Sequence, residues 1–347
     1  MAYTTINKST DYFNTKLYAG SNSTQAVTGV GFQPDWVWIK NRSSTPDHKL
    51  HDAVRGSNKN ISSNTSNAEQ TYTYFNSFDS DGFTLDGNVS DYNQSGSNFV
   101  SWNWLGANGT ANNTDGSINS TVSANTTAGF SIVSFVGNAT SGATVGHGLN
   151  AVPKVVIIKG RDSALGWRSY FAPLGATKYL ELDSTAAEAS NTNFMNDTAP
   201  TNQVFYLGNG TTPNKNGENY IAYCFAEKTG YSKFGSYTGN GSSDGTFVFL
   251  GFKPAFVIYK GVVGANATDN WEMADNKRSP YNGIENVLYP NRNNAEGTGV
   301  TTRMDFLSNG FKMRTTGTDY NGSGQTYIYM AFGQSLVGSN NIPATAR

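Results

Sequence analysis

The sequence predicts an all-β protein made of three tandem antiparallel β-sandwich repeats, of the jelly-roll or immunoglobulin-like type. Three observations carry this prediction: the composition, a strand pair that occurs three times, and frequent turn residues. Of the 347 residues, 37% are hydrophobic and 14% are charged, and 38 are glycines. Short strands joined by Gly- and Asn-rich turns fit this composition, whereas helix bundles do not.

A strand that follows a proline recurs three times along the chain. The prolines are Pro34, Pro153 and Pro254, in GFQPDWVWIK, GLNAVPKVVIIK and GFKPAFVIYK. An aromatic-rich strand follows each proline, in SNFVSWNW, ENYIAYCF and QTYIYMAF, and its first aromatic residue lies 65 to 73 residues after the proline. The proline strand and the aromatic-rich strand occur three times in the same order and at nearly constant spacing. This predicts a structural unit that is present three times.

The aromatic-rich strands predict a register for the interior. We expect Trp102, Tyr223 and Met330 to occupy one equivalent buried position in the three repeats. The residues two positions further on, on the same face, are Trp104, Phe225 and Phe332. The pairs Asp81-Gly82 and Asn309-Gly310 come before further strands and are residue types that tight hairpin turns require.

The proline strand is apolar on both faces. Trp36 and Trp38 point to one side of the strand, and Val37 and Ile39 point to the other. An ordinary two-layer sheet buries only one face. We expect loops and a neighbouring repeat to cover the second face, and an interface between subunits is the alternative.

Composition also predicts the domain boundaries. Residues 106–129 contain no Trp, Tyr or Phe and are rich in Asn, Gly, Ser and Thr, which predicts a linker. The expected segments are an N-terminal segment 1–14, repeats 15–105, 130–228 and 229–335, and a C-terminal tail 336–347.

Several function classes do not fit the sequence. The net charge of −1 gives no support for nucleic-acid binding. No apolar run approaches the ~20 residues of a membrane-spanning helix, so we expect no membrane insertion. The start of the chain lacks a basic segment followed by an apolar core, which predicts synthesis in the cytoplasm without a secretory signal. Cys224 is the single cysteine, so no disulfide forms within the chain.

No motif for catalysis or for a cofactor is present, so we expect no enzyme, no catalytic residue and no cofactor. The histidines are predicted to be structural or on the surface, because His48 and His51 fall on opposite faces of a strand. We therefore expect no metal ligand among them. Asp79, Asp81 and Asp86 lie close together, and the sequence leaves open whether they bind a structural calcium or form a solvated turn.

A D-x-x-R pattern occurs in the first and third repeats as Asp52 with Arg55 and as Asp275 with Arg278. A carboxylate–guanidinium contact that fixes a turn explains this pattern, and ligand binding is the alternative. Trp167 and Trp271 begin the same element in the second and third repeats. These two rings are candidates for stacking on a sugar, with core packing as the alternative.

Four stretches carry a resemblance to a known group of proteins: YSKFGSYTGNGS, GFKPAFVIYK, FLSNGFKMRTTGTDYNGSGQTYIYMAFGQ and NIPATAR. They resemble a repeat of structural proteins of tailed bacteriophages, especially marine ones. The resemblance implies a virion component, fibre- or spike-like, that recognises host surface polysaccharide. The alternative is a structural or decoration protein of capsid or tail that binds other virion proteins without meeting a receptor.

The resemblance supplies no catalytic residues. It leaves the oligomeric state open between a homo-oligomer, such as the trimer common among fibres and spikes, and a monomer whose three repeats imitate one.

Overall fold

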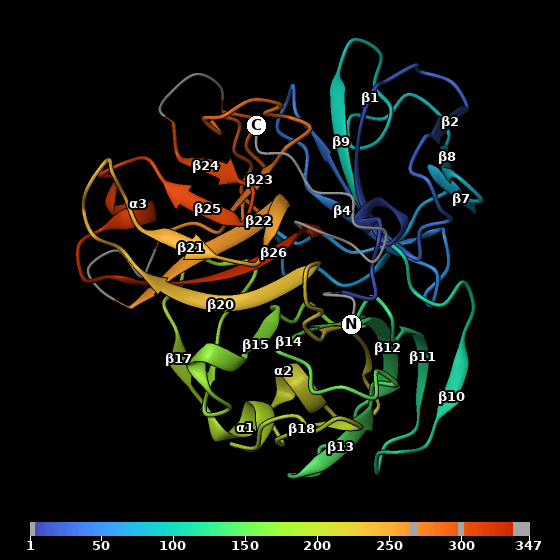
Figure 1. Cartoon of the computed structure of the whole chain (residues 1–347). Coiled ribbons are helices and arrows are strands. Elements are labelled where there is room, and N and C mark those ends of the chain that lie inside the picture. The colour runs from blue at the N-terminus through green and yellow to red at the C-terminus, as the bar shows by residue number, and fades with distance from the viewer. Residues whose placement is uncertain (1–3, 264–268, 298–301, 336–347) are drawn as a thin grey trace. The chain divides into compact units, whose positions relative to one another are not determined.

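Antiparallel sheets dominate the structure, which confirms the predicted all-β class (Figure 1). The computed structural model describes residues 4–263, 269–297 and 302–335. The chain divides into two compact units. The first, here called the two-repeat unit, contains Thr10–Asp183 and Ala189–Ala226. The second, the third-repeat unit, contains the described residues of Met1–Ser9, Ser184–Glu188 and Glu227–Arg347.

The first repeat has a four-stranded sheet in the order β1-β9-β3-β4. Its strands are β1 (Phe13–Ala19), β9 (Asn98–Trp104), β3 (Trp36–Asn41) and β4 (Lys49–Asp52). A smaller sheet has the order β2-β8-β7, with β2 (Gln25–Thr28), β8 (Gly82–Leu85) and β7 (Phe75–Asp79). The short strands β5 (Lys59–Asn60) and β6 (Gln70–Thr71) pair with each other.

The second repeat has a six-stranded sheet in the order β10-β11-β12-β19-β14-β15. Its strands are β10 (Ala111–Asn113), β11 (Ser120–Asn125), β12 (Phe130–Val136), β19 (Asn219–Phe225), β14 (Val155–Gly160) and β15 (Arg168–Phe171). Two further pairs are β13 (Ala143–Gly146) with β18 (Val204–Leu207), and β16 (Lys178–Tyr179) with β17 (Ala189–Ser190).

The third repeat has a four-stranded sheet in the order β20-β26-β22-β23. Its strands are β20 (Ser232–Thr238), β26 (Thr326–Ser335), β22 (Phe252–Val263) and β23 (Glu272–Asp275). The smaller sheet has the order β21-β25-β24, with β21 (Phe247–Phe249), β25 (Gly310–Met313) and β24 (Met304–Leu307). The N-terminal segment joins this unit, since the Ser9 backbone N–H donates to Oε1 of Gln334 over 2.8 Å.

Helices are short. They are η1 (Ser9–Asp11), η2 (Ala172–Leu174), α1 (Thr192–Met195), α2 (Thr211–Asn214) and α3 (Thr318–Asn321). The scarcity follows from the composition, because Asn, Gly, Ser and Thr favour turns and caps over helix interiors.

The three main sheets share one strand order and one register. In each, the last strand of the repeat lies between the first strand and the proline strand, and the D-x-x-R element or its counterpart lies at the edge. The register pairs Trp36 with Trp104, Val155 with Phe225, and Phe256 with Phe332. Each first-named residue lies two positions after a proline, although Pro254 itself lies within β22, beside a shift in register.

The interior positions follow the same register. Trp102, Tyr223 and Met330 pair with Trp38, Ile157 and Ile258 in their respective proline strands. Trp104, Phe225 and Phe332 lie two residues on, and all six side chains of these two sets are buried.

Residues 106–129, expected to be a linker, differ from that expectation. They contain β10 and β11, which extend the second sheet, and Val122 pairs with Val133. The side chain of Val122 lies in the core of the second repeat. STVSAN forms β11, between β10 and β12, and its mixture of small apolar and polar residues is enough for a strand whose side chains are only partly buried. The expected tail 336–347 lies outside the described residues.

One face of each proline strand packs into the core of its own repeat. Val37 and Ile39 contact residues of the small β2-β8-β7 sheet, among them Phe83 and Leu85. The corresponding residues are Val156 and Ile158 in the second repeat, and Val257 and Tyr259 in the third.

The second face of β3 packs against the second repeat. The ring of Trp36 stacks on Tyr223, with centroids 4.3 Å apart and an interplanar angle of 19°. Phe130 and Phe225 of the second sheet lie 5.7 and 6.1 Å from the same indole. Inter-repeat packing therefore accounts for the apolar second face of β3, as the sequence predicts.

Each proline strand carries a buried lysine near its C-terminal end. Lys40, Lys159 and Lys260 donate from Nζ to backbone carbonyls, including those of Ser44, Leu165 and Asp269 at 3.2, 2.7 and 2.7 Å. Burial lowers the pKa of each to about 8. The ammonium groups thus hold the loop that follows each strand.

The hairpin glycines give the first prediction. Gly82 has φ of 146°, and a Cβ there would lie 2.0 Å from the carbonyl oxygen of Val27. We expect Gly82→Ala to destabilise the protein by about 1–3 kcal/mol, because an alanine needs both this backbone conformation and space. Urea unfolding checks this, with Gly109→Ala as control, since nothing lies within 4 Å of that Cβ. Equal stability of the two variants would contradict the steric argument.

Candidate functional site

The two tryptophans proposed for sugar stacking are both buried. Trp167 is 0% exposed and Trp271 is 1% exposed. The indole N–H of Trp167 donates to the Ser62 carbonyl over 3.0 Å, so a loop of the first repeat covers this ring. Neither ring is accessible to a sugar in this structure. Both tryptophans pack in the core, which was the alternative interpretation of the sequence. The sequence could not show this, because the covering loop lies about a hundred residues away.

The D-x-x-R pairs are buried ion pairs. Nε of Arg55 lies 2.5 Å from Oδ2 of Asp52, and both side chains are fully buried. The Arg55 backbone N–H donates to Oδ1 of Asp52 over 2.9 Å, which closes a turn. Arg278 and Asp275 make the same contacts at 2.6 and 2.8 Å. The pairs fix turns, as the sequence predicts.

Each buried pair includes a glutamate that the sequence did not indicate. Nη1 of Arg55 lies 3.1 Å from Oε2 of Glu69, and Nη1 of Arg278 lies 3.1 Å from Oε2 of Glu296. Both glutamates lie in loops, at different distances along the chain from their arginines. Because the spacing is irregular, no sequence pattern marks them.

In the two-repeat unit this network joins the repeats. Glu69 also accepts from Nε and Nη2 of Arg161 at 2.9 and 3.0 Å, and the Tyr223 hydroxyl donates to Oδ2 of Asp52 over 2.8 Å. Burial alone would lower the pKa of Arg55, but Asp52, Tyr223 and Glu69 raise it. Burial raises the pKa of Glu69, but the hydrogen bonds and charges of Arg161 and Arg55 lower it by more, so the pKa lies below its usual value. This network joins two sheets, and its charged groups already have hydrogen-bond partners within the protein.

The histidines are structural. Nδ1 of His48 accepts from the Trp38 indole over 2.8 Å. His51 stacks on Phe75 at 4.4 Å, and burial lowers its pKa to about 3. Burial also lowers the pKa of His147. None of these rings is exposed to solvent.

The carboxylates considered for calcium accept hydrogen bonds instead. Asp81 accepts from the backbone N–H groups of Gly29 and Gly31 at 2.9 and 2.6 Å, and these bonds lower its pKa. Asp79 accepts from the hydroxyls of Ser77 and Thr84 at 2.7 and 2.6 Å. Donors occupy the oxygens that a cation would need, which favours the interpretation as a turn. In the described ranges no group of three His, Cys, Asp or Glu side chains is placed to hold a metal.

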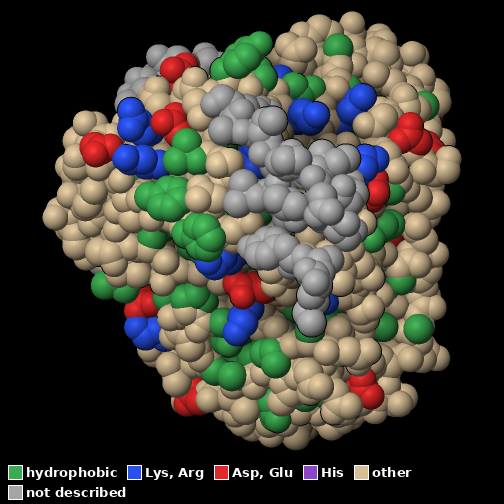
Figure 2. Space-filling view, in the orientation of Figure 1, with side chains coloured by type: hydrophobic (Ala, Val, Ile, Leu, Met, Phe, Trp, Pro, Cys, Tyr) green, Lys and Arg blue, Asp and Glu red, His purple; other side chains and the backbone are tan. Residues whose placement is uncertain are grey.

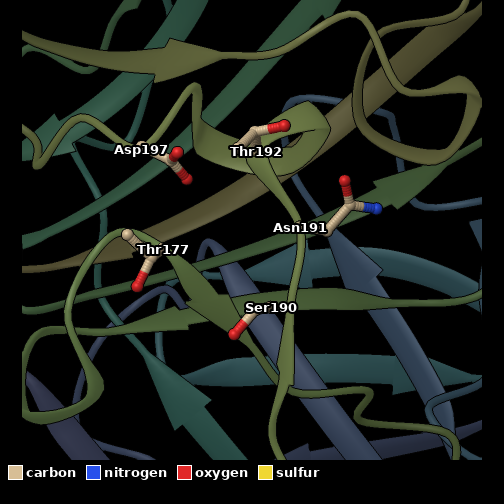
Figure 3. Close-up of a pocket in the computed structure, with 5 residues that line it drawn as sticks. All are labelled: Thr177, Ser190, Asn191, Thr192 and Asp197. Atoms are coloured by element: carbon tan, nitrogen blue, oxygen red, sulfur yellow. The ribbon is translucent and has the colours of Figure 1, made fainter.

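A hollow in the second repeat presents polar groups to solvent. Its volume is about 400 Å³, and its lining comprises Thr177, Ser190, Asn191, Thr192 and Asp197. Figure 3 shows the carboxylate of Asp197 and the hydroxyls of Thr177 and Ser190 around one open space. We call this the threonine–aspartate pocket.

The strand pair β16-β17 and helix α1 position these side chains. Oδ1 of Asn191 caps α1 by accepting from the Asn193 backbone N–H over 2.9 Å, which leaves its Nδ2 for another acceptor. The helix ends at Met195 and is followed by Asn196 and Asp197, whose φ angles are 51° and 49°. Asn and Asp adopt left-handed conformations more readily than other non-glycine residues, and these conformations turn the chain away from the helix axis after α1. They orient Asp197 toward the hollow.

A second hollow of about 410 Å³ adjoins the first and shares Asn191 with it. Its lining also includes Arg168, Asn193, Asn209 and Thr212. Arg168 contacts Oε1 of Glu181 at 2.6 Å and lies over the Tyr179 ring, 4.6 Å from its centroid. Together the two hollows present hydroxyl, amide, carboxylate and guanidinium groups.

The position of Arg168 carries a charged residue in every repeat. Lys49, Arg168 and Glu272 pair across the sheet with Ile39, Ile158 and Tyr259, which occupy one position of the proline strand. Lys49 lies 3.3 Å from Asp91 and 5.9 Å from the centroid of Tyr72. No sequence pattern marks this position, because the three residues differ in charge and size.

On the face that Figure 2 shows, most of the surface carries neither hydrophobic nor charged side chains. Among the residues that the structure describes, no helix has the length and apolar character needed to cross a bilayer.

Comparison with known proteins gives one finding. The family described as "Domain of unknown function (DUF7483)" matches residues 8–335. No curated protein and no solved structure matches the chain.

Proposed function

We propose that this chain, which belongs to the family of the domain of unknown function DUF7483, is a binding protein that recognises surface polysaccharide. The observation that carries the proposal is the threonine–aspartate pocket. Its five polar side chains are exposed around one hollow, in and next to the strand pair β16-β17 and helix α1. Function follows from such a site and not from the β-fold, which serves many purposes.

The chemistry of the pocket fits a sugar. Neighbouring sugar hydroxyls both donate and accept hydrogen bonds. A site that binds them therefore offers acceptors, such as a carboxylate, together with amide and hydroxyl groups that can donate. Asp197 supplies an acceptor, Asn191 supplies donors, and Thr177 and Ser190 supply groups that do both. Hydrogen bonds to the charged carboxylate are the stronger ones.

The proposal places the protein in a tailed-phage virion, as a fibre- or spike-like component that meets host polysaccharide. The resemblance of the sequence to repeats of phage structural proteins supports this placement. Repeated binding surfaces in an oligomer would add avidity, since linked sites gain about 10²–10⁴-fold without new contacts. For the oligomeric state we propose two alternatives, a homo-oligomer such as a trimer, or a monomer.

The proposal also includes three tandem β-sandwich repeats, 15–105, 130–228 and 229–335. The shared order of the main sheets and the smaller sheets beside them support it. An experimental structure in which the three segments superpose, with Pro34, Pro153 and Pro254 at equivalent positions, would test this part.

The pocket gives the second prediction. We expect Asp197→Ala and Asn191→Ala each to weaken binding of bacterial surface polysaccharide about 10-fold or more, because each loses hydrogen bonds at a polar ligand. The measurement is a screen of extracted polysaccharides from candidate hosts, followed by titration calorimetry with the strongest binder.

Asp115→Ala is the matched control. Asp115 is an exposed aspartate of the two-repeat unit that lines neither hollow. Equal loss in the control would show a general charge effect and contradict the pocket. Binding that neither pocket variant changes would place the site elsewhere.

A second candidate is a structural or decoration protein that binds other virion subunits. Phe247 and Phe249 favour it, because they are 43% and 55% exposed on β21, an edge strand. Exposed apolar side chains on an edge strand suit protein contacts. No binding to any host polysaccharide, together with stable attachment to isolated capsids or tails, would favour this candidate.

A further inference from the structure

The small sheet of the third repeat has an open edge at β21. In the order β21-β25-β24, only one side of β21 pairs with a described strand. The Thr246 carbonyl and the Leu250 N–H, at the two ends of β21, bond to backbone groups of β25 and its preceding turn at 3.0 and 2.9 Å. Because alternate residues of an antiparallel strand bond to the same neighbour, Phe247 and Phe249 turn their N–H and C=O groups away from β25.

The side chains at this edge are aromatic and basic. Phe247 and Phe249 are exposed, whereas Val248 between them lies in the core. Lys233 of β20 reaches the edge, where its Nζ donates to the Phe249 carbonyl over 2.7 Å and lies 5.4 Å from the centroid of the Phe249 ring. The edge therefore presents outward backbone groups, two rings and an ammonium group.

The same edge carries small residues in the other two repeats. The register of the small sheets aligns three buried valines, each of which lies opposite a buried phenylalanine: Val27, Val145 and Val248. The residues on either side of these valines are Ala26 and Thr28, Thr144 and Gly146, and Phe247 and Phe249. Large apolar side chains at these two positions are thus specific to the third repeat.

In the second repeat another segment of the chain occupies this edge. The Ile118 N–H donates to the Thr144 carbonyl over 2.9 Å, and the Thr144 N–H donates to Oγ of Ser117 over 2.9 Å. Ile118 forms a parallel bridge with Val145, and its side chain packs in the core. Since Thr144 is equivalent to Phe247, the fold accepts an extended segment at the position that is open in the third repeat.

The charges beside β21 favour an acidic ligand. Lys312 and Arg314 contact Asp244 at 2.5 and 3.7 Å, and Arg314 also contacts Asp305 at 3.3 Å. Lys233 forms no ion pair with a carboxylate of the described residues and bonds to a neutral carbonyl instead. Three cations thus stand beside two carboxylates, and the ammonium group of Lys233 can pair with a third.

A second copy of β21 suits this edge less well. Self-pairing would bring the Lys233 ammonium groups of two copies to one contact, and lysines at an edge strand disfavour such pairing. The two partly exposed rings offer on the order of 200 Å² per copy, whereas a stable interface buries about 800 Å² per partner. A short peptide segment needs less area, because backbone hydrogen bonds supply much of its affinity.

We propose that β21 binds an extended, acidic segment of another polypeptide by β-strand addition. The backbone of the segment bonds to the outward N–H and C=O groups of Phe247. Its apolar side chains cover the rings of Phe247 and Phe249, and a carboxylate pairs with Lys233. The inference rests on the second candidate function, binding to other proteins, and gives the partner a chemical class. It is independent of the threonine–aspartate pocket.

Selection from a random library of short displayed peptides tests the proposal, with the whole protein as bait. We expect the selected peptides to combine aliphatic and acidic residues, and fluorescence anisotropy of the synthetic peptides gives their Kd. Phe247→Ala combined with Phe249→Thr introduces the residue types of Ala26 and Thr28, which the same edge of the first repeat carries. This double variant should keep the wild-type circular dichroism spectrum and weaken binding about tenfold or more.

Further variants separate the contributions to binding. Phe247→Pro and Phe247→Ala both remove the ring, but only proline removes the outward N–H, so it should weaken binding about fivefold more. Lys233→Gln should weaken binding about two- to fivefold, because it removes an exposed ion pair. Tyr281→Thr is the control, since Tyr281 is an exposed aromatic residue of the same unit, and it should bind as the wild type does.

A library that yields no binding peptide would overturn the proposal, and so would peptides that bind the double variant as tightly as the wild type. Equal binding by Phe247→Pro and Phe247→Ala would show contact without strand addition. A wild-type dimer in sedimentation that becomes a monomer in the double variant would assign the edge to a second copy instead. Attachment to capsids or tails that the double variant leaves unchanged would keep the second candidate function and overturn β21 as its site.

Discussion

Replacing Arg55 with methionine is expected to lower the free energy of unfolding of the two-repeat unit by about 3–5 kcal/mol, because it leaves buried carboxylates without their cation. Asp52 has no other charged partner in the described contacts, and Glu69 loses one of its two arginines. Urea unfolding followed by tryptophan fluorescence measures this, since all the tryptophans except Trp271 lie in the two-repeat unit.

A double-mutant cycle separates the ion pair from packing. Asp52→Leu combined with Arg55→Met removes both charges, so we expect the double variant to lose less stability than the sum of the two single variants. Lys215→Met serves as the surface control, because Lys215 is 45% exposed in its pair with Glu218 and should lose under about 1 kcal/mol. Additive losses in the cycle would contradict a coupled buried pair.

Replacing Trp36 with alanine is expected to cost the two-repeat unit about 3–5 kcal/mol, because the indole fills the space between two sheets. Trp36 is 2% exposed, and its ring contacts Trp104 of its own sheet at 4.4 Å as well as Tyr223 of the next. We expect the remaining aromatic rings to leave a cavity, because they belong to sheets that cannot close completely.

Val136→Ala is the control for this loss, since Val136 is 49% exposed in the same unit and should change stability by under about 0.5 kcal/mol. The measurement is urea unfolding followed by far-ultraviolet circular dichroism, which does not depend on the tryptophan removed. A loss below about 1 kcal/mol for Trp36→Ala would show that the two sheets are stable without this contact.

The structure also explains why some residue patterns were readable and others were not. The D-x-x-R pairs were readable because a turn of three residues brings both side chains together locally. Glu69 and Glu296 were not, since they reach the same arginines from loops of different length. Three buried asparagines each accept, at Oδ1, from a backbone N–H group in the first hairpin of a repeat: Asn93 from Ser21, Asn214 from Asn138 and Asn321 from Asn240. They were missed for a different reason: Asn is common throughout this chain, so a structural Asn does not stand out.

The sequence by itself determined the all-β class, the proline strands and the register of the strands that pair with them. These depend on alternation along a strand and on turn residues, which are local properties. It also determined that the proline strand needs cover on both faces, because all three copies are apolar on both sides.

Only the tertiary structure decided what lies against each face and which side chains remain exposed. The loop that contains Ser62 covers Trp167, and this removes a sugar-stacking ring that the sequence offered. The threonine–aspartate pocket arises where β17, α1 and the residues before β16 meet, and its members are ordinary surface residues until that folding brings them together. The physical reason is the same in both cases: contacts between loops depend on the three-dimensional path of the chain, which no local periodicity records.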